Sequence, residues 1–304
     1  MSRRIDIPFL VDLLLVDEAA LMTRLNGHPN IGRHPVKSGR WINEAFRKHI
    51  ESHLRVGDSP LPVFVGPEPA ASRAPQKDLA ARFDAAAAEG LNAHAEDVRR
   101  LAAYVAGGAE SGIGVITQRI VGRMYQPAYS ATAESYQAAG VLAGSADPIR
   151  GAIPVWTGGL ARALARLGSA AANDVHCIHG TAVALPHVVA TVRIMRKAFE
   201  DGDADRHATP ADAVRSYMRV PPMLLRSCAA DTQVEGLGRP LRAGTLVIFQ
   251  LAKTVATSGE FDRAFARGEW NQCPASRAAF VLLEQVWEGA CRVRRGGTAA
   301  AAAS

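Results

Sequence analysis

Apolar side chains recur every three or four positions along most of this chain, which is the spacing that gathers them on one face of a helix. The spacing predicts helices over residues 8–25, 39–55, 78–90, 92–107, 111–125, 159–167, 181–199, 209–219 and 274–293. Two short segments are expected to be extended, Leu61–Val65 and Gly244–Phe249, although a buried helix starting near Gly244 also fits the second. The pattern therefore predicts a mainly α protein with little strand.

Prolines gather within residues 57–75, in a stretch that is otherwise typical of a loop. This stretch separates an N-terminal helical arm, residues 1–75, from a helical body, residues 76–293. Residues 294–304 are rich in glycine and alanine, so we expect a disordered tail. Because no internal repeat and no clear linker divides the chain, one structural domain is expected overall.

The predicted helix at 181–199 carries a histidine on its apolar side. Helical neighbours of His187 are Ala190, Thr191 and Ile194, whereas the basic residues of this helix fall on other faces. These neighbours offer an imidazole almost no hydrogen bonds, yet a buried imidazole needs partners. Two interpretations remain open: an ordinary core histidine bonded to a backbone carbonyl elsewhere, or a ligand of a metal or haem.

A second histidine repeats this arrangement. His94 stands at the start of the predicted helix 92–107, on the same side as Val98 and Leu101. Considered alone, His94 is a partly solvated residue of a first helical turn. The pair of histidines is what raises the haem interpretation.

Composition and charge exclude several functions. The chain has 304 residues and a net charge of +6, and five of its 35 basic residues are lysines, leaving 30 arginines. No predicted helix has a dense basic face and aromatic residues are only 6%, which argues against nucleic acid as a partner. No apolar run is long enough to span a bilayer and no segment reads as a signal peptide, so we expect a cytoplasmic protein without a membrane partner. The spacing of the four cysteines suggests free thiols rather than a zinc site or disulfides.

Motifs of the common cofactor folds and hydrolases are missing: the sequence contains no G-x-G-x-x-G, P-loop, G-x-S-x-G or H-E-x-x-H. A helical bundle with an inward histidine can hold haem, because an imidazole binds the iron, apolar side chains flank the porphyrin and arginines meet the propionates. We therefore expect His187 to bind haem iron, with Thr191, Ile194 and Arg226 as further cofactor contacts. His94 is the candidate distal acid–base residue.

The segments Leu185–Val189 and Met223–Cys228 carry a resemblance to a known family. The sequence resembles the haem-dependent L-tyrosine hydroxylases of natural-product pathways, which belong with the histidine-ligated haem aromatic oxygenases around tryptophan dioxygenase. A related member has an axial histidine followed further along by H-x-x-x-C, whose cysteine bonds the haem. Here Cys228 lies 41 residues after His187, but Leu224 stands where the second histidine would be. We therefore expect ordinary haem b.

This resemblance implies a single helical domain of the tryptophan dioxygenase fold. It implies hydroxylation of L-tyrosine ortho to the phenol, giving L-DOPA, with hydrogen peroxide or oxygen as oxidant in antibiotic biosynthesis. Arg119 and Arg123 are candidates for the substrate carboxylate, since a guanidinium fork suits a carboxylate. A homodimer is left open.

A second resemblance is to the C-terminal part of a cytochrome P450. It is carried by residues 217–250 and by Cys273-Pro-Ala275, which opens a helix as a thiolate ligand would, because a helix N-terminus lowers the pKa of a thiol. The sequence departs from that pattern in three ways. The glycine-rich run before the cysteine is reduced to Gly268, Ser216 or Asp212 replaces the glutamate of a Glu-x-x-Arg pair, and the chain is short.

The second resemblance implies a cysteine-ligated haem monooxygenase using Cys273. A third interpretation is a non-enzymatic helical binding protein, in which His94 and His187 are ordinary core residues.

Overall fold

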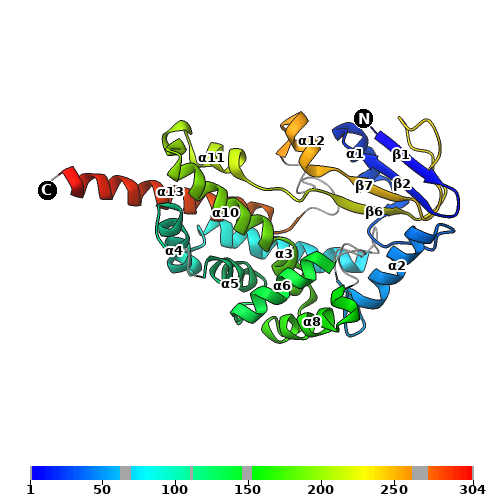
Figure 1. Cartoon of the computed structure of the whole chain (residues 1–304), viewed down its shortest axis with the longest axis horizontal. Coiled ribbons are helices and arrows are strands. Elements are labelled where there is room, and N and C mark those ends of the chain that lie inside the picture. Colours follow the sequence, from blue (N-terminus) through cyan, green and yellow to red (C-terminus); the bar gives the residue numbers. More distant parts are fainter. Residues whose placement is uncertain (1, 62–69, 110–111, 146–152, 262–272, 303–304) are drawn as a thin grey trace. The chain divides into compact units, whose positions relative to one another are not determined.

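Strands from the start of the chain pair with strands near residue 230 in one mixed sheet, as the computed structural model shows (Figure 1). The structure describes residues 2–61, 70–109, 112–145, 153–261 and 273–302. The chain divides into two compact units. The sheet unit comprises residues 1–74, 144–164 and 220–273, and the helical unit comprises residues 75–143, 165–219 and 274–304.

The main sheet has five strands in the order β1-β2-β7-β6-β3. They are β1 (Ser2–Ile7), β2 (Val11–Val16), β3 (Ile31–Gly32), β6 (Leu224–Cys228) and β7 (Leu246–Phe249). Strands β2 and β7 are parallel, and the other neighbours are antiparallel. A separate hairpin joins β4 (Arg55–Val56) to β5 (Ser59–Pro60). The expectation of little strand is therefore wrong, although the strand expected at Gly244–Phe249 is confirmed as β7.

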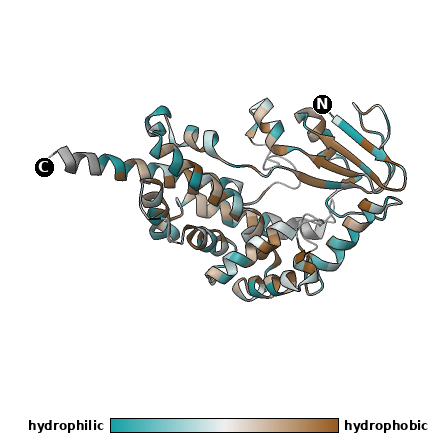
Figure 2. Cartoon of the chain, in the orientation of Figure 1, coloured by the Kyte–Doolittle hydropathy of each residue, from teal (hydrophilic) through white to brown (hydrophobic). Residues whose placement is uncertain are grey.

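Strand β2 corrects the helix expected over residues 8–25, because only α1 (Ala19–Gly27) is helical there. β2 lies inside the sheet between β1 and β7, and its apolar residues are mostly buried. Figure 2 shows β2 and β7 as largely hydrophobic ribbons, whereas much of β1 is hydrophilic. A strand covered on both faces is a continuous apolar run, which periodicity cannot separate from a buried helix.

The sheet unit also contains α2 (Trp41–His53), α12 (Leu251–Ser258) and the first part of α8 (Gly159–Ala170). One cluster of buried residues, drawn from β2, α1, β3, β6 and β7, forms its core; it includes Leu14, Val16, Leu21, Leu25, Ile31, Val247 and Phe249. α2 was expected over 39–55, and the structure confirms it.

The helical unit is built around α10 (Leu185–Glu200), which packs against α4 (Ala95–Val105), α5 (Ile113–Tyr125) and α13 (Ser276–Ala302). It also contains most of α3 (Ala70–Ala88) and α6 (Ala133–Ser145), the last part of α8, and all of α9 (Val175–Val183) and α11 (Pro210–Tyr217), with 3-10 turns at Asn92–His94 and Asp203–Arg206. The stretch Val175–Glu200 is long and apolar enough to cross a bilayer, but 56% of its most apolar part is buried within the protein, as in a core helix.

Local signals placed several of these helices correctly. The Thr209 side chain accepts a hydrogen bond from the Asp212 amide at the start of α11, as a capping residue does. Pro186 stands in the first turn of α10, directly after the break that separates this helix from α9. The sequence analysis missed α6, α12 and most of α9, and α13 continues beyond residue 293, where its end was expected. Four of the five residues of the extended segment expected at Leu61–Val65 lie outside the described residues. The division into arm, body and tail stays a prediction.

Three helical glycines, Gly114, Gly122 and Gly180, allow tyrosine rings to approach the helix backbone closely, and two of them show how closely. A Cβ on Gly122 of α5 would lie 2.2 Å from the Tyr129 ring, and one on Gly180 of α9 would lie 2.3 Å from the Tyr125 ring. Side chains larger than hydrogen are excluded at both positions unless the rings move. The helical unit is therefore closely packed around α5 and α9.

Candidate functional site

α10 carries three of the predicted site residues. His187 is half-buried, Thr191 is fully buried and Ile194 is half-buried. Burial lowers the pKa of His187, which favours the neutral imidazole at neutral pH.

The Thr191 hydroxyl is already engaged within the protein. It donates to the His187 carbonyl oxygen at 2.7 Å and accepts from the Arg219 amide at 2.9 Å. Thr191 therefore fastens α10 to the chain that follows α11.

His94 ends a 3-10 turn and precedes the first residue of α4. Its Nδ1 atom is buried and has no hydrogen-bond partner among the described residues. Burial and then the neighbouring Arg123 guanidinium lower the pKa of His94, while the Asp97 carboxylate opposes them. A neutral imidazole has one nitrogen that can accept a hydrogen bond, and the lowered pKa keeps His94 in that neutral form.

Asp97 lies close to His94 and pairs with one of the two arginines that were predicted to bind substrate. Arg119 holds the Asp97 carboxylate with two hydrogen bonds, of 2.8 and 2.7 Å, and Asp97 is buried. Arg123 is exposed one turn further along α5. The structure therefore pairs Arg119 with Asp97, and it brings both Asp97 and Arg123 close to His94. The sequence analysis missed Asp97, because an acidic residue in a first helical turn is also typical of a partner for the helix dipole.

Arg226 lies in the other compact unit, on β6, and is almost fully buried. Its guanidinium donates to the Leu225 carbonyl at 2.8 Å and to the Asn26 side-chain oxygen at 3.4 Å. Burial and the nearby Arg33 pull the pKa of Arg226 well below its ordinary value. Within the part of the chain that the structure describes, no carboxylate pairs with this guanidinium.

The cysteines occupy different settings. Cys228 is fully buried on β6, its thiol donates to the Ala230 carbonyl at 3.0 Å, and burial raises its pKa. Such a thiol is protonated and belongs to the core. Cys273 is half-buried and stands three residues before Ser276, the first residue of α13. The glycine-poor run that precedes Cys273 lies outside the described residues.

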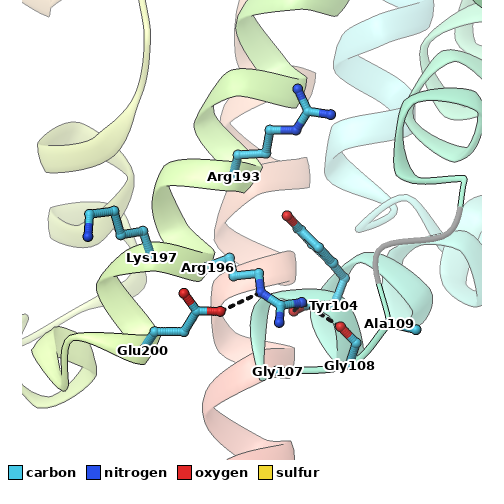
Figure 3. A pocket seen from close by; sticks show the side chains of 8 residues that line it. All are labelled: Tyr104, Gly107, Gly108, Ala109, Arg193, Arg196, Lys197 and Glu200. Carbon is cyan, nitrogen blue, oxygen red and sulfur yellow. Dashed lines mark hydrogen bonds and ion pairs between the residues drawn. The ribbon is translucent and has the colours of Figure 1, made fainter.

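A pocket of about 620 Å³ opens between the C-terminal parts of α4 and α10 (Figure 3). The Arg196 side chain crosses this pocket and donates hydrogen bonds to the Glu200 carboxylate at 2.7 Å, to the Tyr104 carbonyl at 3.1 Å and to the Gly108 carbonyl. Its guanidinium also lies 4.7 Å from the centre of the Tyr104 ring. Cations at the carboxyl ends of helices stabilise the carbonyls there. None of the residues predicted for the functional site lines this pocket. The described ranges also contain no group of three or more His, Cys, Asp or Glu side chains that could hold a metal ion.

No protein-family model matches the chain, and no curated protein matches it either. Solved structures do match. A mycinamicin VIII methyl hydroxylase from Micromonospora griseorubida is 15% identical, with a TM-score of 0.56, covering 98% of this chain and 86% of that one. CYP164A2 from Mycobacterium smegmatis is 14% identical, with a TM-score of 0.58 and coverage of 93% and 84%. The P450 heme domain of Tepidiphilus thermophilus is 14% identical, with a TM-score of 0.53 and coverage of 91% and 80%.

These neighbours overturn the first resemblance. The tryptophan dioxygenase fold, membership of the L-tyrosine hydroxylase family and the hydroxylation of L-tyrosine to L-DOPA are wrong, because the matching structures are cytochrome P450 proteins and the chain contains a five-stranded sheet. They do not support a histidine iron ligand either. The apolar stripe around His187 is explained by packing, since α10 is surrounded by α4, α5 and α13.

The expectation of haem agrees with these neighbours, one of which is described as a heme domain. The second resemblance, to the C-terminal part of a cytochrome P450, agrees with coverage that extends over more than nine-tenths of this chain. The chain therefore has the fold of the cytochrome P450 haem domains.

Proposed function

We propose that this protein is a cysteine-ligated haem monooxygenase in which Cys273 is the iron ligand. The proposal rests on the position of Cys273 just before the N-terminus of α13, in a chain that has the fold of the cytochrome P450 haem domains. The thiol is half-buried and stands three residues before the start of α13, whose buried residues include Ala278, Leu282 and Val286. A thiolate near a helix N-terminus is stabilised by the helix dipole, which favours the form that binds iron.

Arg226 supports the same proposal from the sheet unit. A buried charge that lacks an opposite charge costs several kcal/mol, and Arg226 is buried with only two neutral acceptors, on Leu225 and Asn26. A carboxylate beside the guanidinium would remove most of that cost. We infer that Arg226 holds a propionate of haem, so the donors of the chain fit this group.

Haem with a thiolate ligand supplies the cleavage of an O–O bond. The proposed reaction class is hydroxylation with oxygen or peroxide, because two of the similar structures are themselves named hydroxylases. The acid–base role of His94, which belongs to the helical unit, stays a prediction. The proposal assigns no substrate.

The test is the visible spectrum of the ferrous carbon monoxide complex of protein purified with haem supplementation. We expect the band of a thiolate-ligated haem in the wild type and its loss in Cys273→Ser. Cys291→Ser should keep the band, because it removes a different half-buried thiol, which lies on α13. His187→Ala should keep it as well. A band that survives in Cys273→Ser, or that disappears only in His187→Ala, would overturn the assignment of the ligand.

A second candidate is a protein of this fold that binds without catalysis. The observation that favours it is the pair Asp212–Arg215 on α11, which stands near the expected Glu-x-x-Arg pair but is loosely joined at 3.9 Å, with side chains 48% and 65% exposed. Such a pair contributes little to stability. Protein that is fully folded, colourless and unable to take up haem would support this second candidate.

A further inference from the structure

Five large apolar side chains are exposed together at one place in the sheet unit. Phe9 is 82% exposed, Trp41 70%, Ile7 45%, Leu10 39% and Ile42 37%. The Trp41 amide donates to the Phe9 carbonyl at 2.9 Å, and the Ile42 amide donates to the Leu10 carbonyl at 2.8 Å. These bonds join the β1–β2 turn to the start of α2, which lie beside each other in Figure 1. We name these five residues the aromatic tip.

The conformation of Phe9 is unfavourable for this residue type. The Leu10 amide donates to the Ile7 carbonyl at 3.1 Å, which closes a tight turn with Pro8 and Phe9 at its centre. Phe9 follows the proline with a φ of 61°, a backbone region that favours glycine. A glycine would close the turn with less strain, and a polar residue would be better solvated. A phenylalanine at this position therefore does not stabilise the turn, which points to a contact that its ring makes with a partner.

The charges beside the aromatic tip are mainly positive. Arg40 precedes Trp41 and pairs with Asp6 at 2.7 Å, and Arg242 reaches the same carboxylate at 3.9 Å. Two guanidinium groups thus share one acidic residue, which itself precedes Ile7. A partner that suits this surface combines apolar groups with negative charge.

The size of the tip decides which partner fits. Its two rings are the largest part of the surface, and an aromatic side chain buries about 150–250 Å². A stable interface between two copies of a protein needs about 800 Å² on each side. The tip is therefore too small for a dimer interface, whereas aromatic rings flanked by arginines are suited to the head-group region of an anionic bilayer.

We propose that the aromatic tip binds reversibly to the surface of anionic phospholipid membranes. Phe9 and Trp41 insert their rings below the phosphates, and Arg242, whose side chain is 63% exposed, lies at the level of the phosphates. The binding is peripheral and is compatible with a cytoplasmic location, because the cytoplasmic leaflet carries the anionic lipids. It is independent of haem and of Cys273.

The test is co-sedimentation of the full chain with phosphatidylcholine vesicles, with and without phosphatidylglycerol. We expect binding to the anionic vesicles that decreases with added salt. Phe9→Gly should weaken it about tenfold or more, since a buried aromatic ring contributes strongly, and should raise the urea midpoint, because glycine suits the positive φ. Trp41→Ser should also weaken binding, whereas Trp41→Phe should retain most of it.

The matched control is Met223→Ser, which removes another exposed apolar side chain of the sheet unit (57% exposed) and should leave vesicle binding unchanged. The proposal is overturned if the wild type stays in the supernatant with anionic vesicles, or if Phe9→Gly and Trp41→Ser both bind as well as Met223→Ser. Light scattering that shows a wild-type dimer and a Trp41→Ser monomer would assign the tip to a second copy of the chain instead.

Discussion

Removing the Arg119 side chain separates two interpretations of this residue. The sequence nominates Arg119 as a partner for a substrate carboxylate, whereas the structure pairs it with Asp97, at 2.8 and 2.7 Å. If the ion pair is its role, Arg119→Ala leaves the Asp97 carboxylate with little solvent and without its cation. If substrate binding is its role, the folded protein loses little stability.

The magnitude follows from how far the pair is buried. The side chain of Arg119 is 26% exposed and that of Asp97 is 11% exposed. Breaking a fully buried pair costs about 3–5 kcal/mol, and breaking an exposed pair costs about 0–1 kcal/mol. The intermediate burial predicts a loss of about 2 kcal/mol in the free energy of unfolding. With a urea dependence of about 1–3 kcal/mol/M, the midpoint falls by about 1 M.

Urea unfolding followed by circular dichroism measures this loss, and Asp97→Ala with the double variant completes a cycle. We expect a coupling energy of about 1–2 kcal/mol between the two side chains. The control is Arg99→Ala on α4, the helix that carries Asp97, because the Arg99–Glu96 pair is 74% and 71% exposed and should contribute about 0.5 kcal/mol or less. An Arg119→Ala protein as stable as Arg99→Ala would refute the reasoning.

Three further predictions concern packing, pH and thiol reactivity. Gly122→Ala should lower the free energy of unfolding, measured in urea, by about 1–3 kcal/mol, because the new Cβ would lie 2.2 Å from a tyrosine ring. Its control is Gly140→Ala, whose Cβ would meet nothing within 4 Å and which should stabilise α6 by up to about 1 kcal/mol. The free energy of unfolding should fall as the pH falls below about 6.5. Burial lowers the pKa of His94 in the folded protein, so the unfolded chain binds the proton more readily. His94→Gln should make the free energy of unfolding depend less on pH, and an unchanged slope in this variant would contradict the prediction. Iodoacetamide should modify Cys291 in the folded protein before Cys177, because burial raises the pKa of the Cys177 thiol to about 12. Equal labelling of the two cysteines, measured by mass spectrometry, would show that burial does not protect Cys177.

The sequence located much of the helical unit. The periodicity near Ile113–Tyr125 and Pro210–Tyr217, with the Thr209 cap, gave helices that the structure confirms. Each of these signals is local, since a helix satisfies its hydrogen bonds within one segment and buries one stripe. Only some residues of the candidate site could be predicted from the sequence. His94, Arg119 and Arg123 were named from the sequence, but Asp97, which pairs with Arg119 close to His94, was not.

Tertiary structure decided the rest, because strand pairing and burial depend on residues far apart in the chain. Strand β2 becomes a strand rather than a helix because β7, more than 200 residues later, pairs with it from Leu13↔Leu246 to Val16↔Phe249. The same holds for charge: the sequence named Arg226 as a haem contact, but only the structure shows that the sheet buries it with no carboxylate partner among the described residues. The exposure of Phe9 is equally invisible in the sequence, since the turn at 7–10 sets its direction. Periodicity thus determined the helical elements, and non-local pairing determined the sheet, the fold and the environment of each candidate residue.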